Sequence, residues 1–329
     1  MKFSIIITTY NRANIIPMCL DSLINQSYSK SDYEIIIVNN NSTDNIEQVA
    51  ANYIKENPDV NIRYYFTSKR GQVYARQMGI LASQNEILSF TDDDGILDSD
   101  WLKEISKVFL INDKVVGVAG KINIKWDEPP PDWIYEYESY LGKLDYGNEV
   151  KFEVGMYMNA GNLSIKKDVL IEVGGFNPEM VGEWLIGDGE TGLWNKLKEK
   201  NYLIGWAPGA LMHHYQIVKK NATVEDIKRR FMNNGICVPY NIYAVKREGN
   251  KKLIKNMIHS LKKGLKWGYK RYKSSFAKNK KGEYYAIFRR AFYYAQVGYT
   301  LKIFFNKEFR TEITKEDWLV ENKSKEILP

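Results

Sequence analysis

Cysteine and histidine are scarce in this sequence of 329 residues, which contains two Cys and three His. Two isolated cysteines, Cys19 and Cys237, cannot form a disulfide framework, so we expect a reducing compartment, the cytoplasm. No run of about 18 apolar residues occurs, because charged residues interrupt the nearest one, at residues 284–305. The first residues also lack the basic and apolar leader of an exported protein. These absences argue against a secreted or membrane-spanning protein.

Zinc-finger, homeodomain and RNA-binding motifs are absent too, so we expect no nucleic acid partner despite a net charge of +7.

This net charge is unevenly distributed along the sequence. Residues 246–282 contain 14 Lys or Arg and a single acidic residue, so the segment carries +13 and the rest of the chain −6. A mildly acidic body with a strongly basic C-terminal segment indicates two separate tasks, and the basic segment is suited to an anionic membrane surface.

Apolar strand-like segments alternate with amphipathic helical ones over the first 120 residues. Strands are predicted at residues 3–9, 33–38, 62–66, 86–90 and 115–119, and helices at residues 15–24, 44–55, 73–82 and 101–110. This alternation predicts an α/β fold with a mostly parallel sheet flanked by helices. Further strands are predicted at residues 161–165, 203–206 and 210–215, and a helix capped by Thr223 runs to residue 234. Residues 125–151 are rich in Trp, Tyr and Pro and predict a long aromatic loop.

Polar groups follow the predicted strands, at residues 9–11, 39–41, 68–71 and 92–94. Ligands of such sheets bind beyond the carboxyl ends of the strands, so these groups predict a shared binding edge. The basic residues among them, together with Arg76, suit phosphate oxygens, although exposed Lys and Arg are common on any surface.

Three adjacent carboxylates, Asp92, Asp93 and Asp94, stand at the end of a predicted strand. Like charges at this spacing repel one another unless a cation holds them, and oxygen ligands suit Mg²⁺ or Mn²⁺. A solvated acidic turn is the alternative. His213 and His214 end a later strand, and one of them is a candidate to complete the metal site, or else is structural.

Residues 187–193 (GDGETGL) lead into an amphipathic helix and contain two more carboxylates. Asp188 or Glu190 can serve as a general base that takes a proton from an attacking hydroxyl. In the alternative interpretation neither residue is catalytic. Asp188 then caps the helix, and the negative charge of Glu190 interacts favourably with the positive end of the helix dipole.

These pieces, in this order, resemble the family 2 inverting glycosyltransferases of the GT-A fold. The resemblance covers about residues 1–235. It rests on residues 4–11 (SIIITTYN), 38–44 (VNNNSTD), 90–94 (FTDDD), 174–176 (GGF) and 187–193, with Gly71, Ala75, Arg76 and Gly79. No single motif is decisive, but their shared register is specific.

The resemblance implies the transfer of a sugar from a UDP- or GDP-linked donor to the hydroxyl of a glycan or lipid-linked acceptor, in the assembly of bacterial-type surface polysaccharide or glycoconjugate. It implies Mg²⁺ or Mn²⁺ at Asp92 and Asp94 with His214, and a base at Glu190, with Asp188 as the alternative. The donor nucleotide is then expected at Thr8, Tyr10, Asn11, Asn39, Asn41, Arg76, Asp92 and Asp93. The acceptor is expected at Trp133, Gly161, Asn162 and Trp184, with a local core as the alternative for the aromatic residues.

Two departures from the family pattern concern these roles. Asn39 stands where the family usually has Asp, and Asp188 and Glu190 replace an adjacent Glu-Asp pair. Because Asn39 replaces the usual Asp, a catalytically silent protein that binds a nucleotide sugar is an alternative function. A sugar nucleotidyltransferase would have a glycine-rich basic loop after the first strand, which residues 8–12 are not. The Gln-x-x-Arg-Trp signature of processive relatives is missing, so we expect transfer of a single sugar.

We predict a catalytic domain at residues 1–240 and a helical, basic extension at residues 246–329. Within the catalytic domain, residues 1–120 form the nucleotide-sugar half and residues 121–240 the acceptor half. In the extension, apolar residues at helical spacing share one face: Leu253, Ile254, Met257, Ile258, Leu261 and Leu265. Lysines surround this face, which predicts peripheral attachment to the inner face of a membrane, or else packing on the catalytic domain.

Overall fold

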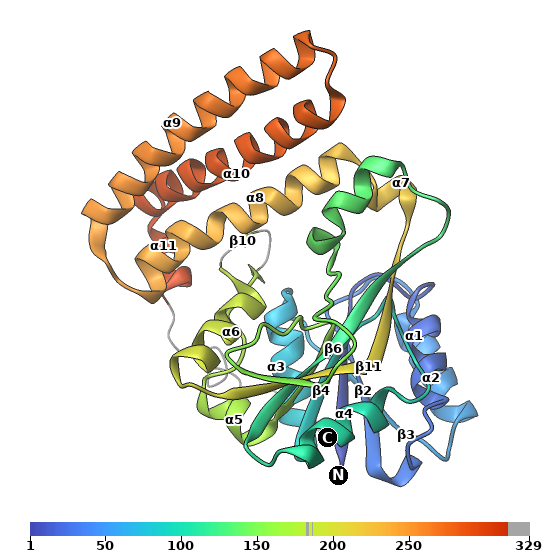
Figure 1. The fold of residues 1–329 in the computed structure, drawn as a ribbon. Coiled ribbons are helices and arrows are strands. Elements are labelled where there is room, and N and C mark those ends of the chain that lie inside the picture. The colour runs from blue at the N-terminus through green and yellow to red at the C-terminus, as the bar shows by residue number, and fades with distance from the viewer. Residues whose placement is uncertain (182–183, 186, 315–329) are drawn as a thin grey trace.

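A nine-stranded, mostly parallel sheet forms the centre of the protein (Figure 1). The computed structural model describes residues 1–181, 184–185 and 187–314, with the backbone alone for residues 180, 181, 184 and 185. The strand order is β3-β2-β1-β4-β8-β6-β11-β5, with β7 also paired to β11. The strands are β1 (Phe3–Thr9), β2 (Tyr33–Asn39), β3 (Asn61–Phe66), β4 (Ile87–Asp92), β5 (Gly95–Leu97), β6 (Val115–Trp126), β7 (Lys151–Val154), β8 (Asn162–Lys166) and β11 (Leu203–Gln216).

Strands β1 to β4 run parallel, as do β6 and β11, whereas β8, β5 and β7 run antiparallel to their neighbours. The expectation of a mostly parallel sheet is therefore confirmed. The two strands predicted at residues 203–206 and 210–215 are a single strand, β11, whose register against β6 shifts between Ala207 and Leu211. An irregularity of this kind looks like a chain break in the sequence pattern.

Helices cover both faces of the sheet because successive strand side chains point to opposite sides. In β1, Ile5 and Ile7 pack in the apolar cluster under one set of helices, and Ile6 packs in the cluster under the other. The first set is α1 (Ile16–Ile24), α2 (Ile46–Glu56) and α4 (Trp101–Ile111). The second is α3 (Gln72–Ala82), α5 (Lys167–Glu172) and α6 (Gly189–Glu199).

A stack of long helices follows the sheet and forms a separate layer at the top of Figure 1. It contains α8 (Val224–Tyr240), α9 (Gly249–Phe276) and α10 (Lys280–Phe305), with the shorter α7 (Val218–Asn221), η3 (Asn241–Val245) and α11 (Lys307–Ile313). α10 packs against both α8 and α9. Thr223 caps α8 as expected, because its side chain accepts a hydrogen bond from Asp226 N. None of the helices in the described ranges is both long and apolar enough to cross a membrane.

The aromatic segment after β6 is not the loop that its composition predicted. β6 continues to Trp126, and a 3₁₀ helix, η2 (Asp132–Leu141), follows it. The side chains of Ile134, Tyr137 and Leu141 pack with residues of α8 and α10 in one apolar cluster. This segment therefore joins the sheet to the stack of helices. The predicted boundary between residues 240 and 246 remains a prediction.

Candidate active site

The loops after β1 and β2 are tied together at the predicted binding edge. Asn11 adopts a positive φ of 52°, and its backbone N donates to Ser42 Oγ at 2.9 Å. Its side chain accepts a hydrogen bond of 2.7 Å from Thr43 N. The short amide side chain tolerates this left-handed conformation and bonds locally. The β1 loop is thus held in place beside β4, where the acidic residues lie.

Asp92, Asp94 and His214 come together where β4 ends. Strand β5 returns directly after the acidic turn and pairs with β11, so that His214 lies opposite Gly95. Tyr215 N also donates to the backbone oxygen of Asp94 at 2.9 Å. As a result, one ligand atom from each of the three side chains lies within 4.8 Å of the others. Sequence-distant residues thereby form the cluster that the resemblance implied.

The three side chains fit a divalent cation. Among the described residues, no donor reaches Oδ1 of the buried Asp94 in hydrogen-bonding geometry, although Nε2 of His214 lies 3.1 Å from that oxygen. A buried carboxylate oxygen normally accepts a hydrogen bond, and Asp94 Oδ1 accepts none from the described part of the chain. A metal ion bound to both Asp94 Oδ1 and His214 Nε2 would satisfy this oxygen. Two carboxylates and an imidazole are ligands for Mn²⁺, and the carboxylates also suit Mg²⁺.

Arg12 supplies the counter-charge that the sequence analysis did not find for the three carboxylates. Its guanidinium pairs with Asp93 Oδ1 at 2.8 Å and also with Asp94 Oδ2. Burial nevertheless raises the pKa of Asp93 to about 7, against the lowering effect of Arg12. For Asp94 burial acts in the same direction, but the charges of His214 and Arg12 outweigh it and lower its pKa. Asp94 therefore remains ionised and able to ligate a cation.

Two cavities flank the acidic cluster. The larger, of about 600 Å³, is lined by residues of the loops after β1 and β4 and by residues after β11. The smaller, of about 340 Å³, lies between α6, α8 and the segments around η2 and β8. Five residues line both cavities, namely Gln72, Asp92, Glu179, His214 and Arg230. The candidate metal ligands Asp92 and His214 thus stand at the junction of two chambers.

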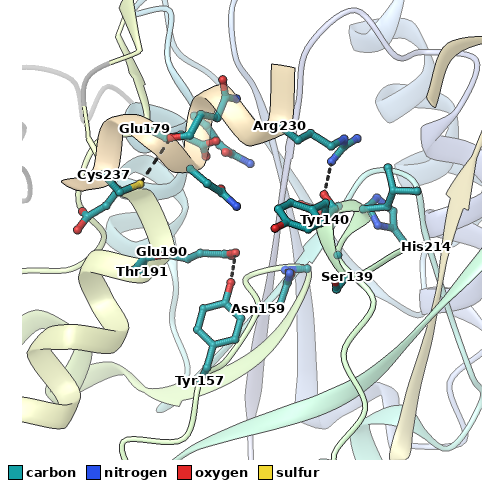
Figure 2. A pocket seen from close by; sticks show the side chains of 18 of the residues that line it. Ser139, Tyr140, Tyr157, Asn159, Glu179, Glu190, Thr191, His214, Arg230 and Cys237 are labelled. Atoms are coloured by element: carbon teal, nitrogen blue, oxygen red, sulfur yellow. Dashed lines mark hydrogen bonds between the residues drawn. The ribbon is translucent and has the colours of Figure 1, made fainter. Parts of the chain in front are cut away.

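Glu190 lies in the smaller cavity, on the first turn of α6 (Figure 2). Its Oε1 accepts a hydrogen bond of 2.5 Å from Tyr157 Oη, and its Oε2 accepts one of 2.6 Å from Ala160 N. Burial raises the pKa of Glu190 above the ordinary glutamate range, against the lowering effect of these bonds. Each carboxylate oxygen has a second lone pair, so a held carboxylate of raised pKa remains competent as a general base.

Asp188 also lines the smaller cavity, but its carboxylate joins two other parts of the chain. Oδ1 accepts a hydrogen bond from Asn177 Nδ2 at 2.8 Å, and Oδ2 accepts one from Asn241 Nδ2 at 3.0 Å. Asn241 begins η3, so this side chain links the start of α6 to the end of α8. Burial raises the pKa of Asp188 as well, against the lowering effect of these bonds, so Asp188 stays the alternative base while its contacts also join parts of the structure.

The backbone at residues 160–161 connects Glu190 with the acidic cluster. Ala160 N donates to Glu190, and a Cβ added to Gly161 would lie 2.8 Å from Asp92 Oδ2. Gly161 lines the smaller cavity, and its missing side chain allows the close approach of Asp92.

The residues expected at the donor nucleotide divide into two groups. Thr8, Tyr10, Asn11, Asp92 and Asp93 line the larger cavity. Asn39 does not, because its amide donates to Tyr64 Oη at 2.8 Å and accepts from Ser42 N at 2.8 Å. Asn41 is also missing from the lining, and the residue between them, Asn40, lines the cavity instead.

Arg76 lies in the smaller cavity rather than in the larger one. Its guanidinium carbon is 4.8 Å from the centroid of the Phe176 ring, and its charge lowers the pKa of Glu190. Arg76 is therefore close enough to the candidate base to affect its charge, and its expected contact with the donor stays a prediction.

Two residues expected at the acceptor lie elsewhere. Asn162 is 1% exposed, and its amide is fully used: it accepts from Trp101 Nε1 and donates to the backbone oxygens of Lys121 and Ala210. It holds neighbouring strands together and cannot reach a ligand. Trp133 packs on Tyr284, with ring centroids 5.0 Å apart, and lines neither cavity. Trp184 belongs to β10 (Trp184–Leu185), which pairs with β9 (Met180–Val181), and its side chain lies outside the described part of the structure.

The sequence analysis missed several residues at the two cavities. Tyr157 and Asn159 precede β8 in a segment without a recognisable pattern. Arg230 extends from α8 toward η2 and donates to the backbone oxygen of Tyr140 at 3.0 Å (Figure 2). Arg12 was missed as well, although it lies in the polar loop directly after β1, three residues beyond Thr9.

Comparisons with known proteins bear on the family and the fold. Residues 4–174, a little more than half of the chain, match the family model described as Glycosyl transferase family 2. An uncharacterized glycosyltransferase of Nostoc is 36% identical over 124 residues, which are 38% of this chain and 37% of that protein. Glycosyltransferase AglE of Haloferax volcanii is 29% identical over 179 residues, 54% of this chain and 57% of that protein. The chain thus matches less than two thirds of the length of these relatives.

Solved structures of similar fold extend over more of the chain. A mannosyltransferase of Pyrobaculum calidifontis, in complex with GDP-Man and Mn²⁺, has a TM-score of 0.60 and 16% identity, and the match covers 93% of this chain and 88% of that one. Residues 1–349 of TarS from Staphylococcus aureus have a TM-score of 0.51 and 15% identity, with 87% and 90% covered. These likenesses show the GT-A fold.

Proposed function

The chain belongs to glycosyl transferase family 2, and from this premise we propose that it transfers one sugar from a nucleotide-sugar donor to an acceptor hydroxyl, with inversion. One observation carries the proposal. A cluster of Asp92, Asp94 and His214 separates a larger cavity from a smaller one that contains a candidate base. This order is what a direct displacement requires, because the acceptor oxygen attacks the anomeric carbon of the donor from the side opposite the leaving diphosphate.

We assign the larger cavity to the nucleotide-sugar donor. Its lining combines the aromatic ring of Tyr10, the polar side chains of Thr8, Asn11 and Asn40, and the cation Lys220. Such groups suit a base, a ribose and a diphosphate. The mannosyltransferase of similar fold is in complex with GDP-Man, and a TarS structure with a TM-score of 0.50 is in complex with UDP. We therefore propose a UDP- or GDP-linked donor.

Asp92, Asp94 and His214 would hold Mg²⁺ or Mn²⁺, which would supply positive charge for the leaving diphosphate. Glu190 accepts the proton of the acceptor hydroxyl as that oxygen bonds to the anomeric carbon of the sugar. The bond from this carbon to the diphosphate oxygen breaks, and its electron pair leaves with the nucleoside diphosphate. One displacement inverts the anomeric centre. Tyr157 and Ala160 keep the carboxylate directed into the cavity.

The acceptor occupies the smaller cavity in this proposal. Arg76, Arg229 and Arg230 among its lining residues suit an acceptor with negative charge or many hydroxyls, such as a glycan or a lipid-linked sugar. A relative that is 28% identical over 140 residues is named poly(ribitol-phosphate) beta-N-acetylglucosaminyltransferase TarS. We place the reaction in surface polysaccharide or glycoconjugate assembly, and in the cytoplasm, where the free thiols of Cys19 and Cys237 are stable.

A panel of nucleotide sugars tests the proposal. Release of nucleoside diphosphate is measured with Mn²⁺, with and without a panel of glycan acceptors, and the anomeric configuration of the product is read by NMR. Acceptor-dependent release with inversion is expected. Donor binding without turnover across the panel would instead indicate a silent binding protein. Release of pyrophosphate from a sugar phosphate and a nucleoside triphosphate would indicate a nucleotidyltransferase.

A further inference from the structure

The long helix α9 is attached to the protein by one side. Leu253, Ser260 and Gly264 are its buried residues. Ser260 Oγ donates to Gln296 Oε1 of α10 at 2.8 Å, and a Cβ at Gly264 would overlap the ring of Tyr294. This close packing fixes which face of α9 points inward. α9 is also the outermost helix of the stack in Figure 1.

An exposed apolar stripe runs along the flank of α9, about 100° around the helix from this inward face, because Ile254, Leu261 and Leu265 directly follow Leu253, Ser260 and Gly264. Its members follow one another at intervals of three or four residues, which places them on one side of a helix. They range from 42% to 70% exposed: Ile254, Ile258, Leu261, Leu265, Tyr269 and Tyr272. Phe276, at the end of the helix, is 85% exposed. Single exposed apolar residues are ordinary, whereas a continuous row along a helix marks an interaction surface.

The structure also divides the apolar face that the sequence predicted. Leu253 is buried against the stack, and Ile254, Ile258, Leu261 and Leu265 remain in solvent. The sequence analysis gave membrane attachment and packing on the catalytic domain as alternatives for this whole face, and the structure buries only part of it.

Positive charge borders the stripe along its whole length. Gly249–Phe276 contains nine Lys or Arg and no Asp or Glu. An exposed lysine directly follows five of the six stripe residues, as Lys255, Lys262, Lys266, Lys270 and Lys273. One position along a helix is a turn of about 100°, so these lysines lie at the shoulder of the stripe. If two copies of the protein paired through this face, the lysines of one copy would repel those of the other, which disfavours self-association.

We propose that the outer face of α9 binds the surface of an anionic membrane. The stripe enters the boundary between headgroups and acyl chains, the aliphatic parts of the lysines extend along it, and their ammonium groups reach lipid phosphates. The helix lies in the plane of the surface and does not span it. This attachment does not depend on the sugar, the metal or the base assigned above, because no residue of α9 lines either cavity.

Flotation of the full chain with lipid vesicles tests the proposal. Wild type is mixed with vesicles of phosphatidylcholine alone or with added phosphatidylglycerol, at low and high salt. We expect salt-sensitive binding to the anionic vesicles only. The variant Lys255→Glu/Lys262→Glu/Lys266→Glu is expected to bind at least about a hundredfold more weakly, since each nearby lysine adds about 1 kcal/mol. The variant Ile258→Ser/Leu265→Ser removes two exposed stripe residues and is expected to lose at least about tenfold.

Matched variants on other surfaces provide the controls. Lys55→Glu/Lys114→Glu/Lys125→Glu makes the same change in charge, and Leu110→Ser/Ile111→Ser removes two apolar residues that are 74% and 63% exposed. Both are expected to bind as wild type does. The proposal is overturned if the control variants lose as much vesicle binding as the α9 variants. It is also overturned if wild type does not bind anionic vesicles. A dimer in sedimentation that Ile258→Ser/Leu265→Ser abolishes also overturns it, in favour of a second copy. Donor turnover with a water-soluble acceptor should be unchanged in the α9 variants, so this result is separate from the proposed reaction.

Discussion

The hydroxyl of Tyr157 donates a hydrogen bond to Oε1 of Glu190 and so joins the segment after β7 to the first turn of α6. Burial and the nearby charge of Glu190 both raise the pKa of Tyr157, which keeps the phenol protonated and donating. Asp188 is held differently, between Asn177 and Asn241. Both carboxylates line the smaller cavity, but their partners differ: Glu190 is held by Tyr157 and Ala160, and Asp188 joins α6 to the stack of helices.

Glu190→Gln should retain donor binding and lose transfer. The amide keeps the size of the side chain but accepts no proton, and a general base contributes about 10²–10⁴-fold to a rate. We expect a fall of about a thousandfold in kcat with an unchanged Kd for the donor, measured by product release and calorimetry. An active Glu190→Gln enzyme would remove Glu190 from the mechanism.

Asp188→Asn is the matched comparison, since it makes the same change two residues away. We expect a lower Tm, because one of the two amide donors now meets an NH₂ group, and a smaller loss of kcat. If this variant loses more activity than Glu190→Gln at equal stability, the base is Asp188.

The rate should rise with pH through the pKa of Glu190, because only the ionised carboxylate accepts a proton. Burial raises this pKa, so the rising limb is expected above the ordinary glutamate range. Tyr157→Phe removes a bond that stabilises the ionised form, and should move the limb to higher pH. Tyr202→Phe is the control, since Tyr202 bonds Glu172 at the surface at 2.5 Å, and should leave the profile unchanged. Identical profiles for all three proteins contradict the assignment.

Turnover should require a divalent cation. Excess chelator is expected to abolish activity, Mn²⁺ or Mg²⁺ to restore it, and Asp94→Ala to prevent the restoration, because Asp94 offers a buried oxygen to the site. Asp98→Ala serves as control: Asp98 Oδ1 lies 3.6 Å from Nε2 of the neighbouring His213, outside the cluster. Full turnover in chelator would refute the metal site.

Gly161→Ala should weaken metal binding with little effect on the fold. The added methyl would lie 2.8 Å from Asp92 Oδ2, so this ligand has to move. Disturbing the surroundings of a metal ligand costs about ten- to a hundredfold in affinity, and we expect that loss in a Mn²⁺ titration. Gly298→Ala, where a Cβ meets nothing within 4 Å, should bind Mn²⁺ as wild type does. Unchanged affinity in Gly161→Ala would place Asp92 outside the site.

Arg12→Ala should make the protein depend on metal for stability. Its loss leaves two buried carboxylates without their cation, so we expect the free energy of unfolding to fall by about 2 kcal/mol without metal. Mn²⁺ should then raise the Tm of Arg12→Ala more than that of wild type. Arg63→Ala, which removes the cation from the buried Glu34, should destabilise without any change in the metal effect. If Mn²⁺ raises the Tm of wild type and of both variants equally, Arg12 does not interact with the metal site.

Some failures of prediction share a single cause. Asn162 and Trp133 are residue types that line sugar sites, yet Asn162 holds the sheet together and Trp133 packs on α10. The face of a strand or of a 3₁₀ helix that meets a ligand depends on what packs against its other face. That partner lies more than 40 residues away for Asn162 and on another helix for Trp133. Residue type alone does not contain this information.

The amino-acid sequence by itself determined the elements, because apolar periodicity and caps act over a few residues: β1, the acidic turn after β4 and the Thr223 cap are local features. It also placed the polar strand ends on one edge. Only the tertiary structure decided which of them meet. The pairing of β5 with β11 brings His214 to Asp94, the close approach at Gly161 sets Asp92 beside the segment that holds Glu190, and the packing on α10 decides which side of α9 faces solvent. These relationships depend on contacts between distant segments, and their free energies come from burial and charge that exist only once the chain has folded.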